Sequence, residues 1–366
     1  MSAPKRVINF GIIGTGKSAH NFAKALTSTR HGKLIAVGSR KKERAKKFAK
    51  EFRLPFYLSS YEKLANNSEV DVIYIATPNA CHKDNALTCL NAGKNVLIEK
   101  SFSTNFKDAK ILINLAIEKR LFLMEAMWTR FLPAFNKMEQ LIDSGEIGEL
   151  KSFNATLGQP SVISKDSNLF NYPMGGGATL DLGIYLVFWA HYLFGIPARV
   201  QSDMYYGDAD VDLTTSTILS YDQGRYAHIS SSIITRFTNN GIIYGTKGAI
   251  EIHQPLYCPT AISVIKYSKA SRLMGKQSIL SSVLSIVKRI SLLKNLYINY
   301  PLLGRYILRK DIKKTIYMPI KGNGLQYMIE EVSNHLLGNN SQIIPLDETL
   351  AIMETIDKIK STPNAG

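Results

Sequence analysis

Short apolar runs alternate with amphipathic stretches through the first third of the chain. The runs are apolar throughout rather than at every second position, which is typical of strands buried on both faces of a sheet. The helical spacing between them indicates crossover connections, and therefore a parallel sheet. The expected strands are residues 7–13, 34–38, 70–76, 95–98 and 121–124, and the expected helices are 19–26, 42–52, 81–92 and 106–119.

From about residue 150 the pattern changes to a looser alternation of apolar and polar positions. Breaks rich in Gly, Asp or Asn separate the runs, as at residues 222–224 and 239–241. Such runs are typical of an antiparallel sheet with one covered face. The expected strands are 150–158, 198–206, 213–221, 225–234 and 242–253, and the expected helices are 134–144, 179–194, 325–337 and 347–360.

Together the two patterns predict an α/β protein, in which an N-terminal parallel sheet precedes a C-terminal α+β domain with a largely antiparallel open sheet. We place the two domains at residues 1–124 and 125–366. The 366 residues fit two domains of about 100–200 residues each. No window reaches about 18 uninterrupted apolar residues, and the N-terminus lacks the pattern of a secretory signal, so we expect a cytoplasmic protein.

Composition narrows the classes of partner. Three cysteines are too few for a disulfide framework, and their spacing does not match zinc ligands, so we predict no metal site. The net charge is +16, but residues 266–314 contribute +11 of it, which leaves +5 for the other 317 residues. A general nucleic-acid-binding surface is therefore not indicated.

A glycine motif follows the first predicted strand and opens the first predicted helix. In this position the first glycine makes a tight turn, the second lets backbone N–H groups approach a pyrophosphate, and a third small residue lets helix and strand pack closely. The motif predicts that residues 1–124 form a dinucleotide-binding Rossmann domain. The cofactor contacts expected from it are Gly14, Thr15, Gly16 and Ala19.

The end of the second predicted strand selects between NAD and NADP. NAD sites typically have Asp or Glu at this position, which binds the ribose 2′-hydroxyl. This chain has Ser39 and Arg40 there instead. The Arg40 guanidinium can hold a 2′-phosphate through several donors, and Ser39 can add a short hydrogen bond. We therefore predict NADP, with NAD as the alternative.

Polar residues also follow the third and fourth predicted strands. Ligands of open parallel sheets bind at the carboxyl ends of the strands, so we expect these residues to face a cofactor cleft. The contacts we expect there are the polar residues Thr77, Asn79, His82, Glu99 and Lys100, together with Pro78. In the second domain Asp181 and Tyr185 follow a glycine run and, four residues apart, share one face of a predicted helix.

Several short motifs in combination resemble the family of glucose–fructose oxidoreductases, inositol dehydrogenases and rhizopine-catabolism oxidoreductases. They span residues 8 to about 253. The stretches at 124–131 and 181–185 most resemble the dimeric dihydrodiol dehydrogenase branch, also described as NADP-dependent D-xylose dehydrogenase. The motifs are Gly14-x-Gly16-x-x-Ala19, 76–79 with His82, 92–100, 145–148, 175–185 and 245–248.

The resemblance implies an enzymatic role for specific residues. It makes Lys100 and Tyr185 the catalytic pair, puts Asp181 in the substrate pocket, and puts Trp128 at the pocket wall near the nicotinamide, with Arg130 as a further cofactor contact. A tyrosine with a pKa near 10 is a poor base at neutral pH unless a nearby ammonium lowers its pKa, and Lys100 would supply that charge. The resemblance also implies a homodimer or higher homo-oligomer.

Two features depart from the family pattern. Ser101 stands where the family usually has proline after the Glu-Lys pair, which puts the aim of Lys100 in question. The second feature is the basic amphipathic insertion at about 266–314, whose apolar stripe is clearest at 279–293. Three interpretations stay open: the stripe packs on this protein or a second subunit, residues 279–310 contact an anionic membrane, or they bind another partner.

The sequence therefore predicts an NADP-dependent oxidoreductase that transfers hydride between the nicotinamide and a secondary alcohol or hemiacetal carbon of a sugar or cyclic diol. The alternative is a catalytically silent nucleotide-sensing or membrane-associated interaction protein on the same fold. The substrate itself is not predicted, because the loops near 159–174 carry no distinctive motif.

Overall fold

A six-stranded parallel sheet forms the N-terminal part of the computed structural model, which describes residues 6–164, 167–207, 210–267 and 312–362. The strand order is β3-β2-β1-β4-β5-β6, the doubly wound order, which reverses between β1 and β4, the point where sheets of this kind bind ligands. The strands are β1 (Ile8–Ile13), β2 (Gly32–Gly38), β3 (Phe56–Leu58), β4 (Val72–Ile75), β5 (Asn95–Ile98) and β6 (Leu123–Glu125).

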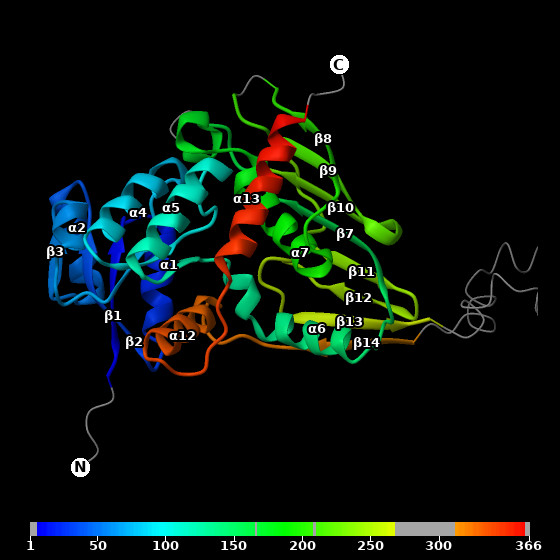
Figure 1. Cartoon of the computed structure of the whole chain (residues 1–366), viewed down its shortest axis with the longest axis horizontal. Helices are drawn as coiled ribbons and strands as arrows, with labels where there is room; N and C mark the ends of the chain where they lie inside the picture. The colour runs from blue at the N-terminus through cyan, green and yellow to red at the C-terminus, as the bar shows by residue number, and fades with distance from the viewer. Residues whose placement is uncertain (1–5, 165–166, 208–209, 268–311, 363–366) are drawn as a thin grey trace, which may run out of the picture.

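Helices connect these strands and cover the sheet, as the alternating pattern predicts (Figure 1). Two short elements, β3 and the helix that follows it, were not expected, because three half-exposed residues give no readable period. That helix begins where the Ser60 side chain accepts a hydrogen bond from the Lys63 amide. The helices are α1 (Lys17–Leu26), α2 (Lys42–Phe52), α3 (Tyr61–Ala65), α4 (His82–Asn91) and α5 (Phe106–Lys119).

An eight-stranded sheet forms the second part, in the order β14-β13-β12-β11-β7-β10-β9-β8. All neighbours are antiparallel except β7 and β10, so the prediction of a largely antiparallel open sheet is confirmed. The strands are β7 (Leu150–Gly158), β8 (Arg199–Tyr205), β9 (Thr214–Tyr221), β10 (Arg225–Ser232), β11 (Gly241–Gly245), β12 (Gly248–Ile252), β13 (Ala261–Lys266) and β14 (Ile312–Tyr317).

Two details of this sheet differ from the pattern prediction. The expected strand 242–253 is two strands, because the chain turns back between Gly245 and Gly248. The ends of the basic insertion lie in β13 and β14, which pair with each other, so both ends belong to the sheet. The predicted helix at 279–293 and the predicted membrane contact at 279–310 lie outside the described residues.

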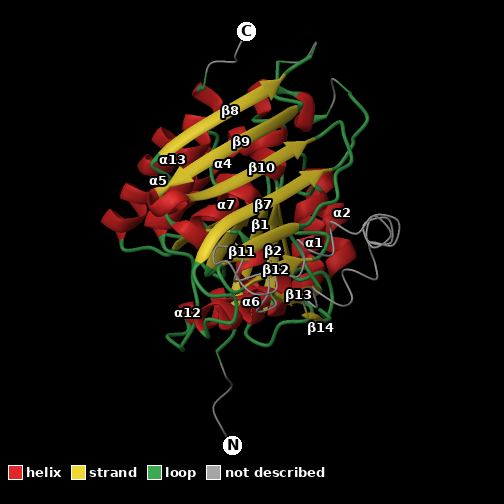
Figure 2. Cartoon of the chain, turned by 90° about the vertical axis from the view of Figure 1, so that its right-hand side faces the viewer, coloured by secondary structure: helices red, strands yellow, loops and turns green. Residues whose placement is uncertain are grey.

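The described helices cover one face of the large sheet, and none of them lies on the other face (Figure 2). They include α6 (Pro133–Asp143), α7 (Ile184–Phe194) and α13 (Leu346–Ser361), and α7 is buried along most of its length. The helix α12 (Leu325–Leu336) returns to pack on α1, so the C-terminal segment joins both sheets. Of the helices in the described ranges, none is both long and apolar enough to span a bilayer.

Candidate active site

The glycine motif forms a cradle at the start of α1. Gly14 has φ +107°, and a Cβ there would lie 2.5 Å from the Ala76 carbonyl oxygen, so only glycine fits this close approach. At Gly16, which precedes the helix, a Cβ would meet no described residue within 4 Å, and no described side chain caps the helix N–H groups. Thr15 lies between them, and the buried Ala19 packs the helix against the sheet. Open space before uncapped N–H groups fits a dinucleotide pyrophosphate.

The end of β2 carries the two residues expected to select the cofactor. Ser39 is buried, and its Oγ accepts a hydrogen bond from the Lys41 amide at 3.3 Å. Arg40 is exposed and lies beside Tyr61. Burial raises the pKa of Tyr61, and the Arg40 guanidinium opposes that rise. A solvent-facing guanidinium at the end of β2 is compatible with a 2′-phosphate.

The segment after β4 is braced against its neighbours by hydrogen bonds. Asn79 Nδ2 donates to the Gly175 carbonyl oxygen at 2.8 Å, which joins this segment, with Thr77 and Pro78, to the glycine run of the second domain. Both His82 ring nitrogens lie against carbonyl oxygens, of Ser101 at 2.7 Å and of Thr77 at 2.9 Å.

His82 is fully buried, and burial lowers its pKa more than the two carbonyls raise it. The ring connects the ends of β4 and β5, which is a bracing function. Direct contact of His82 with a cofactor stays a prediction.

Glu99 and Lys100, at the end of β5, point into the protein. The two Glu99 carboxylate oxygens accept from the Tyr74 hydroxyl and, at 3.1 Å, from the Lys100 amide. The Lys100 ammonium donates to the Asp181 carbonyl oxygen at 2.6 Å and to Asp181 Oδ1 at 2.8 Å. Burial lowers the pKa of Lys100, but the nearby negative groups, Asp181 foremost, raise it by more, so Lys100 is held as a cation.

Tyr185 lies in the first turn of α7, beside that cation. Lys100 Nζ is 5.0 Å from the centre of the Tyr185 ring, and the Tyr185 hydroxyl oxygen accepts from Trp128 Nε1 at 3.1 Å. Burial raises the pKa of Tyr185 well above its ordinary value, while Lys100 and Trp128 lower it by less. The lowering by Lys100 is present as expected, but burial outweighs it, so the phenol is held protonated.

A π-helical turn, η5 (Thr179–Gly183), precedes α7 and delivers Asp181 to Lys100. Such turns are frequent at functional sites. The Ser101 hydroxyl donates to the Leu180 carbonyl oxygen at 2.7 Å, so the residue that replaces the family proline connects the strand that carries Lys100 to this turn. On the other side, the Thr179 amide donates to Asp212 Oδ2 at 2.6 Å.

Trp128 and Arg130 belong to one short helix, η2 (Trp128–Phe131), but lie in different surroundings. Trp128 contacts Tyr185, as described above. The Arg130 guanidinium instead lies over the aromatic rings of Tyr192 at 4.3 Å and Phe135 at 5.3 Å. Its Nη1 atom is buried without a hydrogen-bond partner among the described residues. Contact of Arg130 with a cofactor stays a prediction.

Two residues of the site carried no assignment from sequence. The Tyr257 ring lies 5.7 Å from the Tyr185 ring and 6.2 Å from the Trp128 ring, in an irregular segment with no motif to mark it. Glu125 is buried at the end of β6, and its Oε1 accepts from the Phe102 amide at 3.0 Å. Burial raises the pKa of Glu125 to about 7. Its place inside the motif at 124–131 was the available signal.

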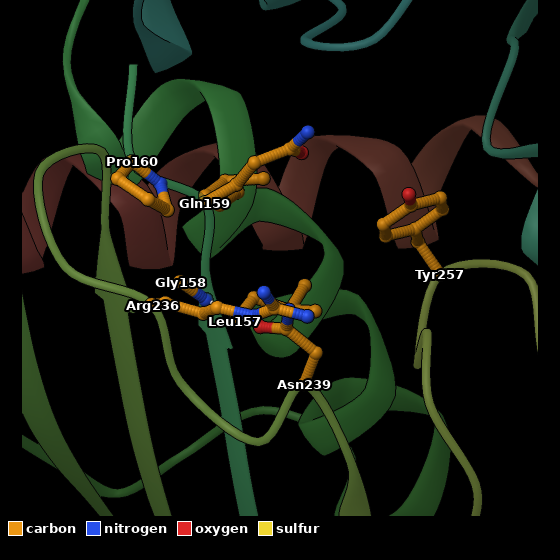
Figure 3. A pocket seen from close by; sticks show the side chains of 8 residues that line it. Leu157, Gly158, Gln159, Pro160, Arg236, Asn239 and Tyr257 are labelled. Carbon is orange, nitrogen blue, oxygen red and sulfur yellow. Dashed lines mark hydrogen bonds between the residues drawn. The ribbon is translucent and has the colours of Figure 1, made fainter. Parts of the chain in front are cut away.

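A cavity of about 290 Å³ adjoins Tyr257 (Figure 3). It lies at the ends of β7 and β10, on the side where η5 approaches the sheet. The residues that line it are Leu157, Gly158, Gln159, Pro160, Leu182, Arg236, Asn239 and Tyr257. Across the described ranges, no group of three or more His, Cys, Asp or Glu side chains is arranged to hold a metal ion.

Comparison with known proteins places both sheets in a family. Residues 8–127 match the model of the oxidoreductase family with an NAD-binding Rossmann fold, and residues 135–251 match the GFO/IDH/MocA C-terminal domain. Trans-1,2-dihydrobenzene-1,2-diol dehydrogenase of Xenopus laevis is 36% identical over 259 residues, which are 70% of this chain and 78% of that protein. The Homo sapiens enzyme of the same name is 32% identical over 267 residues, with the same shares of both chains.

Solved structures with the same fold cover nearly the whole chain. A 3-ketoreductase from Actinomadura kijaniata in complex with NADP and TDP-benzene gives a TM-score of 0.78 at 22% identity and covers 98% of each chain. An aldose-aldose oxidoreductase from Caulobacter crescentus complexed with glycerol gives 0.79 at 20% identity, over 98% of this chain and 97% of that one. The resemblance found in the motifs is thus confirmed: this chain belongs to the GFO/IDH/MocA family of NAD(P)-binding oxidoreductases.

Proposed function

We propose that this protein is an NADP-dependent dehydrogenase of a sugar or cyclic diol, acting at a secondary alcohol or hemiacetal carbon. The observation that carries the proposal is the meeting of Lys100, Trp128 and Tyr185, from three separate segments, beside the cofactor crevice. The relatives named as dihydrobenzenediol dehydrogenases and the aldose-aldose oxidoreductase support this substrate class.

In this proposal, residues of the first domain, together with Trp128 and Arg130, bind the cofactor. The uncapped start of α1 fits the pyrophosphate, and Arg40 with Ser39 supports a 2′-phosphate, hence NADP rather than NAD. When bound, the nicotinamide supplies the hydride for carbonyl reduction or accepts it in alcohol oxidation. The proposed contacts are Gly14, Thr15, Gly16, Ala19, Ser39, Arg40, Thr77, Pro78, Asn79, His82, Glu99, Lys100, Trp128 and Arg130.

Tyr185 is the proposed proton donor in the reduction direction. Its oxygen already accepts from Trp128 Nε1, so its own hydrogen is available for a substrate oxygen. As the carbonyl carbon takes the hydride, the oxygen takes the Tyr185 proton, and the product is the alcohol. The resulting phenolate is stabilised by the Lys100 cation nearby. Alcohol oxidation runs the same steps in reverse and needs Tyr185 deprotonated.

Asp181 is proposed to act at two points. Its carboxylate and its carbonyl oxygen fix the Lys100 ammonium, so Lys100 stays charged and correctly aimed. The Asp181 side chain is also 42% exposed, which leaves a carboxylate oxygen accessible to a substrate hydroxyl. Trp128 would form the wall between this group and the nicotinamide.

A cytoplasmic homodimer is the assembly we propose. The cysteines Cys81, Cys89 and Cys258 are free thiols, which suits a reducing compartment. The apolar side chains of Ile218 on β9 and Tyr226 on β10 are exposed, at positions that alternate with buried ones, and a second copy of the chain would cover them.

The proposal is tested by the absorbance of reduced nicotinamide with a panel of pentoses, hexoses, inositols and cyclic diols. Wild-type protein with NADP should turn over at least one member of the panel, and Tyr185→Phe should lower that turnover by about 10²–10⁴-fold while NADPH still binds. NADP binding with no turnover across the panel would overturn the proposal in favour of a catalytically silent nucleotide-sensing protein.

A further inference from the structure

We infer that the cavity beside Tyr257 recognises a negatively charged group of the substrate, a carboxylate or a phosphate, and that Arg236 is the residue that binds it. This inference rests on the proposed dehydrogenase function and narrows its substrate class. A sugar acid or a sugar phosphate would place its anionic end at Arg236 and its reacting carbon toward Tyr185.

The loop that carries Arg236 is fixed to the end of β7. The Gln159 amide donates to the Ser232 carbonyl oxygen, and the Ser161 amide donates to the Ile233 carbonyl oxygen, each at 2.9 Å. A Cβ at Gly158 would lie 2.4 Å from the Thr235 carbonyl oxygen, so the loop backbone lies directly on this glycine. The backbone of Arg236 is therefore held in place before any ligand binds, which reduces the entropy that binding must overcome.

Asn239 joins this loop to the segment of Tyr257. Its Oδ1 accepts from the Gly158 amide at 2.6 Å, and its carbonyl oxygen accepts from the Leu256 amide at 2.8 Å. On the far side, Thr129 Oγ1 donates to the Tyr257 carbonyl oxygen at 2.6 Å, next to Trp128. One chain of contacts thus runs from the Arg236 loop to the catalytic group.

The cavity lies between these two ends. Figure 3 shows Gln159 and Arg236 on one side of it and Tyr257 on the other. Leu182, which also lines it, is the neighbour of Asp181 in η5. Its volume of about 290 Å³ is at the lower end of small-molecule sites, which span roughly 300–1,000 Å³, so a single sugar ring with its charged group suits it.

The charge of the lining selects the ligand. Among the described residues that line the cavity, Arg236 is the sole charged one, and none is acidic. Within the described part of the chain, Arg236 forms no salt bridge, although nine other pairs meet the same criterion. A guanidinium without a carboxylate partner, at the edge of a cavity, offers two parallel N–H donors that match carboxylate and phosphate oxygens.

Neutral hydrogen-bonding groups complete the lining. Gln159 and Asn239 contribute side-chain amides, and Tyr257 contributes a hydroxyl. These groups suit the hydroxyls of a sugar ring, whereas Leu157, Leu182 and Pro160 supply apolar surface. The set as a whole fits a polar ligand with one anionic end better than a neutral apolar diol.

The test compares kcat/KM for neutral sugars and diols, hexuronates and hexose phosphates in wild type, Arg236→Gln and Arg236→Lys. Wild type should favour one anionic class, and the class it favours distinguishes carboxylate from phosphate. Arg236→Gln should lower kcat/KM for that class by about 10–100-fold and leave neutral substrates within about twofold. Arg236→Lys should lose less. The matched control is Arg199→Gln, an exposed arginine on β8, which should change neither class.

A second readout separates the two proposals. Binding of the same compounds to the protein–NADPH complex is measured by the fluorescence of the bound NADPH, without turnover. Anion binding that weakens in Arg236→Gln supports the anion site even where no compound is turned over, an outcome that would overturn only the dehydrogenase proposal. Equal effects of Arg236→Gln on neutral and anionic compounds, or no effect on either, would overturn the anion site.

Discussion

The two halves of the proposed active site differ in the parts of the chain that form them. In the first sheet, the proposed cofactor site consists of strand ends, a helix start and glycines, so its geometry follows from the backbone. In the second sheet, the proposed substrate side consists of side chains on loops after β7, β10 and β12, held by contacts between distant segments. The first kind of site is marked by short motifs, whereas the second depends on the tertiary fold.

Lys100 and Tyr185 stand at the boundary between these halves. Lys100 follows β5 of the first sheet, and Tyr185 belongs to α7, which covers the second. The two meet because η5 turns Asp181 onto the Lys100 ammonium and Ser101 attaches to the same turn. Changes on one side should therefore affect the cofactor, changes on the other the substrate, and changes at the boundary the chemical step.

The largest effect is expected at the boundary. Tyr185→Phe removes the proposed proton donor, so kcat should fall by about 10²–10⁴-fold with NADPH affinity unchanged. Tyr192→Phe is the control, because Tyr192 lies on the same helix and its hydroxyl donates to Glu139 rather than to the site. Steady-state assays with circular dichroism of both variants measure this, and a Tyr185→Phe enzyme with near wild-type kcat would contradict the assignment.

The next effect concerns the first sheet alone. Arg40→Asp should weaken NADPH binding by about 100-fold, since it replaces a charge-assisted contact with repulsion, and should change NADH binding by less than about threefold. Fluorescence titration of both cofactors measures the ratio. Arg44→Asp, an equally exposed arginine in α2, should leave the ratio unchanged. A variant at Arg40 that still prefers NADP would show that this side chain does not select the cofactor.

A pH effect on stability is expected from Glu125. Burial is the main cause that raises the pKa of Glu125 from 4.5 to about 7. Between pH 4.5 and pH 7, the Glu125 carboxyl is therefore protonated in the folded protein and ionised in the unfolded chain. Stability should therefore decrease as pH rises from about 4.5 through 7 and then level off. Glu125→Gln keeps an acceptor for the Phe102 amide. It should reduce the pH-dependent change in unfolding free energy by on the order of 2 kcal/mol.

Thermal melts of wild type and Glu125→Gln at pH 5.5 and pH 8 measure that difference. Glu149→Gln is the control, because Glu149 is exposed at the surface. An unchanged slope in Glu125→Gln would mean that another group causes the dependence.

The smallest effect is expected on kcat, and it should differ between two buried serines of one loop, Ser101 and Ser103. Ser101→Ala and Ser103→Ala each lose a hydrogen bond, to Leu180 and to Asn105 respectively, and each should cost about 1 kcal/mol of unfolding free energy. Only Ser101 attaches to η5, so only Ser101→Ala should also lower kcat, by a few-fold. Urea denaturation and steady-state kinetics test this pair, and equal kcat values for both variants would remove the positioning role of Ser101.

The same division explains what sequence could predict. Apart from β3 and α3, the order of strands and helices in the first sheet was predictable, as were the glycine cradle and the family, because buried parallel strands and Gly14 leave strong local signals. The strands β13 and β14 were not, since the basic insertion between them interrupts the pattern. Tyr257 and Arg236 carry no motif, and the tertiary fold, including the loop that packs onto Gly158, brings them to one cavity.

The pKa of Tyr185 is the electrostatic property that the sequence predicted wrongly, and burial is the reason. The proximity of Lys100 to Tyr185 led to the expectation of a lowered pKa for Tyr185, but the surrounding side chains exclude water and raise it instead. How far water is excluded from a site depends on how the folded chain packs around it. A sequence motif does not contain that information.

The central claim is that Lys100 and Tyr185 act as one unit in the chemical step. The most direct measurement is kcat at saturating NADPH for Lys100→Met, Tyr185→Phe and the double variant. When two residues act as a unit, removing one already removes the contribution of the other to kcat. The kcat of the double variant should therefore be about as low as that of Tyr185→Phe alone. Losses that multiply in the double variant would contradict the claim, because they would show two independent contributions.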